Sequence, residues 1–205
     1  MGYIKRLGWG IYHWGQTKAF EPDINKTEIR INRMLSSALP YTKYCIWNTS
    51  ILNKWMLHQP SEFYTIVEIE KEALESGFYI LREQYANISL QPGKEILNRY
   101  VLDKTHTVIV MPLISEAPIK KGLLKNTKRS IFSVTIEKLI VDLFSEKEIF
   151  SAQQGSELPF IINNLLSLYS INFNKMFRYA ARRSKKEPLL ELLNSKTKFP
   201  DFYFK

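Results

Sequence analysis

The sequence predicts an α+β fold with a short N-terminal β-hairpin, a mixed α/β part and a helical C-terminal part. Residues 1–134 alternate short β-branched or apolar runs with segments of helical periodicity. Residues 135–205 carry helical patterns only. The 205-residue chain is 45% hydrophobic and 24% charged, with few glycines and prolines, which is a globular composition. Interleaved strands and helices followed by helices alone are typical of α+β proteins.

The N-terminal fifth of the chain predicts a hairpin, a loop, a helix and a strand. Residues 3–14 alternate around Gly8-Trp9-Gly10, whose glycines permit a tight turn. Residues 16–23 have loop character. A helical spacing of apolar residues covers 24–38 and ends before Pro40. Residues 43–47 are a short strand candidate.

The middle of the chain continues the alternation. Asn48 or Thr49 is placed to cap a helix that runs to residue 57. Residues 63–67 are β-branched and aromatic, which favours a strand. Residues 70–85 predict a helix with acids in its first turn, where the helix dipole favours them. The next expected elements are a weak strand at 88–91, a short helix at 95–102 and a strand at 107–111.

The C-terminal half predicts one more strand and then helices. Residues 118–130 lack periodicity and are expected to be a loop or a strand-flanking connection, followed by a strand at 131–134. Thr135 then caps a helix over 136–144, whose apolar residues recur every three or four positions. The remaining helices are expected over the apolar stripe of residues 158–169, after the cap Asn172, and from Pro188 onward.

The net charge is +9, and the cations gather in two segments. Residues 118–130 contain five cations and no acid, and residues 172–205 contain nine cations against three acids. Concentrated cations attract phosphates or an acidic protein surface, although such a face can also serve only solubility. The candidate nucleic-acid-binding residues of these segments are Lys120, Lys121, Lys125, Lys128, Arg129, Lys175, Arg178, Arg182 and Arg183.

The sequence contains none of the common catalytic signatures. It has no glycine-rich phosphate loop and no G-x-S-x-G elbow. No acid stands two residues before a lysine, as in restriction-type nucleases, and no Asp-x-Asp pair exists to hold Mg²⁺ for nucleotidyl transfer. The one carboxylate cluster, Glu68, Glu70 and Glu72, is interpreted as dipole partners at a helix start. A metal role for these acids is the less favoured alternative.

The other potentially reactive residues also predict no chemistry. His13, His58 and His106 lie far apart, and none has another histidine at metal-ligand spacing. Cys45 stands in an apolar run and is interpreted as a small buried hydrophobe. We therefore expect no cofactor, no metal and no enzymatic activity. An enzyme with an unrecognised site is a third, minor hypothesis.

Cellular location follows from what the chain lacks. A single cysteine excludes an intrachain disulfide and favours a reducing compartment. Residues 1–10 carry no apolar run of the signal-peptide kind, and no stretch of about 18 apolar residues occurs. The expectation is a cytoplasmic protein that does not associate with a membrane.

Three stretches, in this order along the chain, carry a resemblance to a known family. Residues 2–12 follow the pattern G-x-I-x-R-hydrophobic-x-x-G-hydrophobic-Tyr of a winged-helix wing. The second stretch is residues 45–60 with 63–65. The third is residues 135–144 with 169–172 and 178–183. Together they resemble the antitoxin and transcriptional-regulator component of abortive-infection E systems, the AbiEi-like proteins of type IV toxin–antitoxin operons.

The resemblance implies a two-part protein. Residues 1–22 would be a winged-helix wing with its linker, and residues 23–205 the antitoxin domain that counters a nucleotidyltransferase-type toxin. Lys5 and Arg6 of the wing would be DNA contacts, with Trp9 and His13 as poorer candidates. The helix that reads DNA precedes the wing in such domains. It would lie before Met1, so this chain is expected to bind operator DNA poorly.

Two hypotheses therefore stand beside each other. The first is an antitoxin and regulator whose partners are the toxin, directly or indirectly, and operator DNA, to which binding is expected to be poor. The second is a basic nucleic-acid-binding module that uses segments 118–130 and 175–186. Binding to phosphates would weaken steeply with salt, at a slope near −0.9 per neutralised phosphate.

Overall fold

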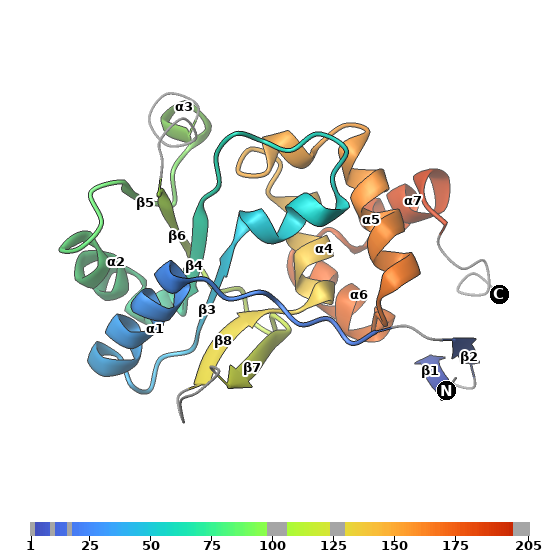
Figure 1. The fold of residues 1–205 in the computed structure, drawn as a ribbon, viewed down its shortest axis with the longest axis horizontal. Coiled ribbons are helices and arrows are strands. Elements are labelled where there is room, and N and C mark those ends of the chain that lie inside the picture. Colours follow the sequence, from blue (N-terminus) through green and yellow to red (C-terminus); the bar gives the residue numbers. More distant parts are fainter. Residues whose placement is uncertain (1–2, 9–10, 16–17, 98–105, 124–129, 199–205) are drawn as a thin grey trace.

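A four-stranded mixed sheet divides the molecule into two halves (Figure 1). The computed structural model describes residues 3–8, 11–15, 18–97, 106–123 and 130–198. The strand order is β3 (Tyr44–Asn48), β4 (Thr65–Ile69), β6 (Val108–Pro112) and β5 (Ile88–Leu90). β3 runs antiparallel to β4, whereas β4, β6 and β5 are parallel. The predicted α+β class is confirmed.

The two faces of this sheet carry separate apolar cores, because successive strand residues point to opposite faces. Ile46 and Val67 face one core, and Trp47 and Ile66 face the other. Every residue of β3 and β4 is buried. Strands covered on both faces favour continuous apolar runs. The polar Asn48 and Thr65 lie at strand ends, and Glu68 within β4 is the one charged residue of these two strands.

Helices cover both faces of the sheet (Figure 1). On one side lie α1 (Lys26–Ala38) and α2 (Leu74–Arg82), which contact each other. On the other side α4 (Ile136–Ser145) packs against α5 and α6. The remaining C-terminal helices are α5 (Glu157–Leu168), α6 (Phe173–Arg182) and α7 (Lys186–Lys196).

A two-stranded antiparallel ribbon extends the structure beside β3. It consists of β7 (Ile119–Leu123) and β8 (Ser130–Val134). The sequence predicted a loop or connection over 118–130, and the first half of this segment is instead a strand. The reason is local pairing, since residues 119–123 match β8 residue by residue. The second half, residues 124–129, lies outside the described residues.

The N-terminal hairpin consists of β1 (Tyr3–Gly8) and β2 (Ile11–Gly15), paired antiparallel as predicted. β1 lies next to α6. Further along, Lys18 pairs with Tyr169 at the end of α5. The buried Phe20 ring packs against Tyr169 at 5.5 Å between centroids. The predicted boundary between residues 1–22 and 23–205 stays a prediction, but Phe20 belongs to the core of the larger part.

One predicted helix is a 3₁₀ helix, and a second one begins with a 3₁₀ turn. The predicted helix at 49–57 is a 3₁₀ helix, η1 (Thr49–Trp55), capped by Asn48. The predicted helix at 70–85 starts as the 3₁₀ turn η2 (Lys71–Ala73) and becomes α-helical only at Leu74. The other short elements are α3 (Lys94–Ile96), whose predicted continuation at 98–102 lies outside the described residues, and η4 (Ser151–Gln153).

Two predicted helix caps are confirmed. The Thr135 hydroxyl accepts a hydrogen bond from the Lys138 backbone N–H at 3.3 Å, and Asn172 Oδ1 accepts one from the Lys175 backbone N–H at 3.1 Å. These bonds satisfy N–H groups that have no partner inside the helix. No helix in the described parts of the chain has the length and apolarity needed to span a bilayer.

The N-terminus of α1 contains a buried acid. Asn25 Oδ1 accepts from the Glu28 backbone N–H at 3.0 Å, and Glu28 Oε2 accepts from the Asn25 backbone N–H at 2.8 Å. Glu28 is buried, and its Oε1 has no hydrogen-bond partner among the described residues. Burial raises the pKa of Glu28 to about 7, against the lowering effect of the Asn25 bond, and Asp23 raises it further.

Glu28 should make the stability of the protein depend on pH. Its carboxyl has a pKa of 4.5 in the unfolded chain and about 7 in the folded one, so the folded state binds the extra proton between these values. This contribution is complete below pH 4.5 and is lost as pH rises through 7, on the order of 3 kcal/mol in total. Glu28→Gln keeps the capping acceptor and should remove the Glu28 part of the dependence, so that its profile is flatter than that of the wild type. Urea unfolding of both proteins from pH 5 to 8 measures it, and parallel profiles would contradict the assignment.

Candidate functional site

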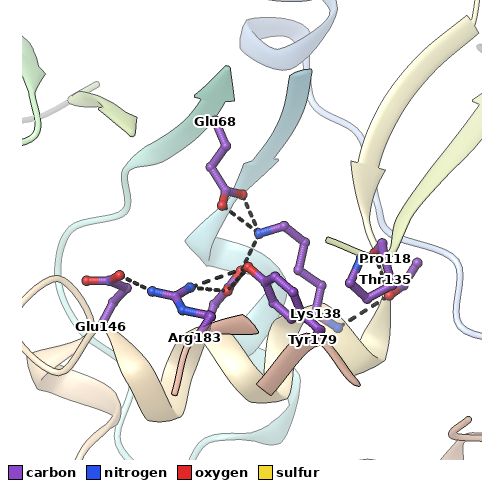
Figure 2. Close-up of polar contacts among 8 residues, drawn as sticks. Glu68, Pro118, Thr135, Lys138, Glu146, Tyr179 and Arg183 are labelled. Atoms are coloured by element: carbon purple, nitrogen blue, oxygen red, sulfur yellow. Dashed lines mark hydrogen bonds and ion pairs between the residues drawn. The ribbon is translucent and has the colours of Figure 1, made fainter. Parts of the chain in front are cut away.

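A cluster of buried charges lies between the sheet and helices α4 and α6 (Figure 2). Its centre is Lys138 of α4, whose side chain is fully buried. The Lys138 ammonium donates to both carboxylate oxygens of Glu68 in β4, at 2.6 and 2.5 Å. It also contacts Asp142, one turn further along α4. One ammonium group therefore connects a strand of the sheet with two positions of the same helix.

Asp142 extends the cluster to α6 and to the residue that follows it. Its Oδ1 accepts hydrogen bonds from the Tyr179 hydroxyl at 2.8 Å and from Arg183 Nη1 at 2.6 Å. The other terminal nitrogen of Arg183 pairs with Glu146, just beyond α4. Three carboxylates thus surround two cations, so the carboxylates are in excess by one charge.

This excess determines the protonation of the cluster. Burial by itself lowers the pKa of Lys138, but the adjacent Asp142 and Glu68 carboxylates outweigh it and hold that pKa well above its ordinary value. Lys138 therefore stays charged. Glu68 responds to the excess of negative charge. Burial raises the pKa of its carboxyl in spite of the nearby Lys138, and Asp142 raises that pKa further.

The predicted position of Glu68 is wrong. The sequence predicts Glu68 at a helix start together with Glu70 and Glu72, whereas Glu68 belongs to β4 and points to the same face as Ile66. Glu70 accepts a hydrogen bond from the Lys43 backbone N–H instead. The missed signal is the pair Lys138 and Asp142, four residues apart within an otherwise apolar helix. Charges at that spacing share one helix side, and here α4 is buried from residue 136 to 144.

A small pocket of about 40 Å³ opens beside the cluster at the carboxyl ends of β4 and β6. That volume holds a few water molecules and is far below the roughly 300–1,000 Å³ of small-molecule sites. Within the described ranges no group of three or more His, Cys, Asp or Glu side chains is arranged to hold a metal ion. Both cations of the cluster are already paired with its carboxylates. The pocket is lined by Trp47, Ile66, Glu68, Met111, Pro112, Ile114, Asp142, Glu146, Ile149, Phe150 and Arg183.

The basic residues of α6 divide into exposed and buried ones. Lys175, Arg178 and Arg182 are exposed, and both arginines pair with Glu116. Arg183 was predicted as a nucleic-acid contact, but only 10% of its side chain is exposed, and it pairs with Asp142 in the cluster. It lies one position beyond the last turn of α6, which directs it toward α4 and away from the basic face.

The other predicted basic residues have different surroundings. Lys120 of β7 contacts Glu21 and donates to the Phe20 carbonyl at 3.3 Å, so a neighbouring acid already compensates its charge. Lys121 is exposed, with its ammonium 5.8 Å from the centroid of the Phe132 ring. Lys125, Lys128 and Arg129 lie outside the described residues. In β1, the backbone of Lys5 lies opposite that of His13 and the backbone of Arg6 opposite that of Tyr12 in the hairpin register.

The cysteine and a histidine take structural positions. Cys45 is fully buried in the core, as expected for a small hydrophobe, and burial raises the pKa of its thiol. A buried thiol with a raised pKa is a poor nucleophile. His58 lies at the surface, with Nδ1 2.7 Å from Glu157 Oε1. The Glu157 carboxylate also accepts from the Leu57 and His58 backbone N–H groups and so fixes the chain after η1.

Replacing Lys138 should destabilise the whole domain. Lys138→Met leaves Glu68 and Asp142 buried without their shared cation, at an expected cost of about 3–5 kcal/mol. Lys147→Met changes an exposed lysine near the C-terminal end of α4, and its effect should stay within about 0.5 kcal/mol. Adding Glu68→Met to Lys138→Met should recover part of the loss, because Asp142 keeps Tyr179 and Arg183. Chemical denaturation measures all three variants. Equal effects of the two lysine changes would show that the cluster is not structural.

Comparison with known proteins places the chain in one family. No curated protein and no solved structure matches it. The model of a family of unknown function, DUF6577, matches residues 1–198. The match includes the hairpin, both halves of the sheet domain and all the C-terminal helices. The chain is therefore a member of the DUF6577 family.

Proposed function

We propose that the protein is the antitoxin and regulator component of an AbiEi-like toxin–antitoxin pair. The observation that carries the proposal is where the resembling stretches lie in the fold. Residues 135–144 contribute Lys138 and Asp142 to the buried cluster, and residues 178–183 contribute Tyr179 and Arg183. Four of the six cluster residues thus come from stretches that resemble this family, and those stretches are about forty positions apart in sequence.

A role in binding, without chemistry, is supported by the state of the cluster. Both of its cations are paired with its own carboxylates, and the adjoining pocket has room for little more than water. A catalytic group needs access to a substrate and a pKa matched to its task. Lys138 is fully buried and Tyr179 is buried with a raised pKa, mainly because of desolvation. The partner would be a nucleotidyltransferase-type toxin, countered by contact or by opposing its modification.

Protection of growth tests this proposal. The chain is expressed in a bacterial host together with the nucleotidyltransferase-type reading frame that neighbours its gene, each under its own inducible promoter. The neighbouring frame alone should arrest growth, and the chain should restore it. Lys138→Met should protect less well, because its lower stability leaves less folded chain, whereas Lys147→Met should retain protection.

Two outcomes would overturn the proposal. One is continued growth arrest in the presence of soluble, folded chain. The other is turnover of labelled nucleotide, DNA or tRNA by the purified chain that disappears in Glu68→Gln or Asp142→Asn while those variants still fold. The second outcome would establish an enzyme with its site in the charged cluster.

A second candidate function, nucleic-acid binding, is favoured by one specific observation. The exposed cations of α6 lie on a helix that contacts β1, the strand with Lys5 and Arg6. In contrast, Lys120 of the other predicted segment is paired with Glu21. If the chain binds nucleic acid, α6 together with β1 is the expected surface. This candidate is compatible with the first, because antitoxins of this kind also act as regulators.

A further inference from the structure

Two arginines of α6 converge on a single carboxylate. Arg178 and Arg182 are four residues apart and therefore lie on one side of the helix. Arg178 Nε is 3.3 Å from Glu116 Oε2. Arg182 Nε donates to Glu116 Oε1 at 2.7 Å, and its Nη2 contacts the same oxygen. The pair forms a preorganised site for an oxyanion, and a side chain of the same molecule occupies it.

The backbone around Glu116 is shaped to present this carboxylate. Glu116 lies in the turn between β6 and β7 and has φ of +61°. Non-glycine residues rarely adopt this left-handed conformation, so it persists only where the surroundings enforce it. The turn is closed by a hydrogen bond from the Ala117 N–H to the Ile114 carbonyl at 3.2 Å. The hydrogen bond from Arg182 lowers the pKa of Glu116, so the carboxylate is ionised at neutral pH.

The surroundings of the site are strongly basic. Residues 172–186 contain no acid. Lys175, Lys185 and Lys186 are exposed like the two arginines. The arginines pair with Glu116, and Lys186 pairs with Glu187 just beyond the segment. Lys175 and Arg182 are seven residues apart, roughly 10 Å along the helix axis. β1 lies beside the same helix. A surface of this kind suits a ligand with several regularly spaced negative charges.

We propose that Arg178 and Arg182 bind one phosphate group of a nucleic-acid backbone and that Glu116 occupies this site until the nucleic acid displaces it. Phosphate and carboxylate oxygens accept the same fork of guanidinium N–H groups. An exposed ion pair is weak, so giving it up costs little, and a polyanion gains from counterion release. The inference rests on the nucleic-acid-binding candidate function and identifies its site and an internal competitor.

The test is binding of a labelled 20-base-pair DNA of random sequence to the full chain at several salt concentrations, followed by fluorescence anisotropy. Glu116→Gln keeps the shape and removes the charge of the competitor. It should tighten binding about two- to fivefold at low salt and steepen the slope of log K against log salt by about one. Arg178→Ala with Arg182→Ala should weaken binding and flatten that slope.

Two controls separate the site from simple changes of net charge. Glu148→Gln adds the same charge, but Glu148 pairs with Lys94 of α3 at 3.3 Å, and α3 lies far from α6 (Figure 1). Its effect should be below twofold. Glu21→Gln instead releases Lys120 of β7. Glu116→Asn provides a second variant for the strained turn, because asparagine tolerates positive φ better than most residues.

Specific results would overturn the inference. Equal gains in DNA affinity from Glu116→Gln and Glu148→Gln would show that the gain comes from the change of net charge alone. A gain in DNA affinity from Glu21→Gln alone would show that the phosphate-binding site lies on β7 and not on α6. Absence of DNA binding in the wild type and in both Glu116 variants, with normal thermal unfolding, would remove the site altogether. The growth-protection assay measures rescue of growth with both genes under separate inducible promoters, whereas this assay measures binding of the purified chain to DNA, so failure here and failure of the antitoxin proposal are recognised separately.

Discussion

The fully buried Lys138 ammonium is the constraint on which the arrangement of this protein depends. A buried charge without partners is strongly destabilising, so Lys138 requires Glu68 from β4 and Asp142 from its own helix at the same time. Asp142 in turn fixes Tyr179 and Arg183 at the C-terminal end of α6. The position of the sheet, the rotation of α4 and the end of α6 are therefore determined together.

This constraint also decides which surface the protein presents. Because Met176, Tyr179 and Ala180 are buried against the domain, the opposite side of α6 must point outward, with Arg178 and Arg182. The hairpin lies next to the same helix. A cluster that serves stability thus positions a basic surface suited to binding, and Glu116 moderates the charge of that surface. Because the buried charges of the cluster have this structural role, their burial is not by itself a sign of catalysis.

Local signals allowed much of the fold to be predicted. The caps Thr135 and Asn172 and the apolar spacing of 136–144 depend on neighbours within a few residues, and these predictions are confirmed. The site could not be predicted in the same way. Glu68 finds its partner seventy residues later, so the acid-rich stretch around it indicated a helix start. Arg183 looked like part of a basic run, and Glu116 is an isolated acid whose role comes from a turn and a distant helix.

Native-state hydrogen exchange tests most directly whether the Lys138 cluster holds these elements together. If it does, amides of β4, α4 and α6 exchange with similar opening free energies, close to that of global unfolding, and Lys138→Met lowers all three together. The account would be contradicted if amides in α6 exchanged through local openings at much lower free energy while those of β4 and α4 stayed protected. In that case α6 would be an independently opening helix, and the cluster would not determine its position.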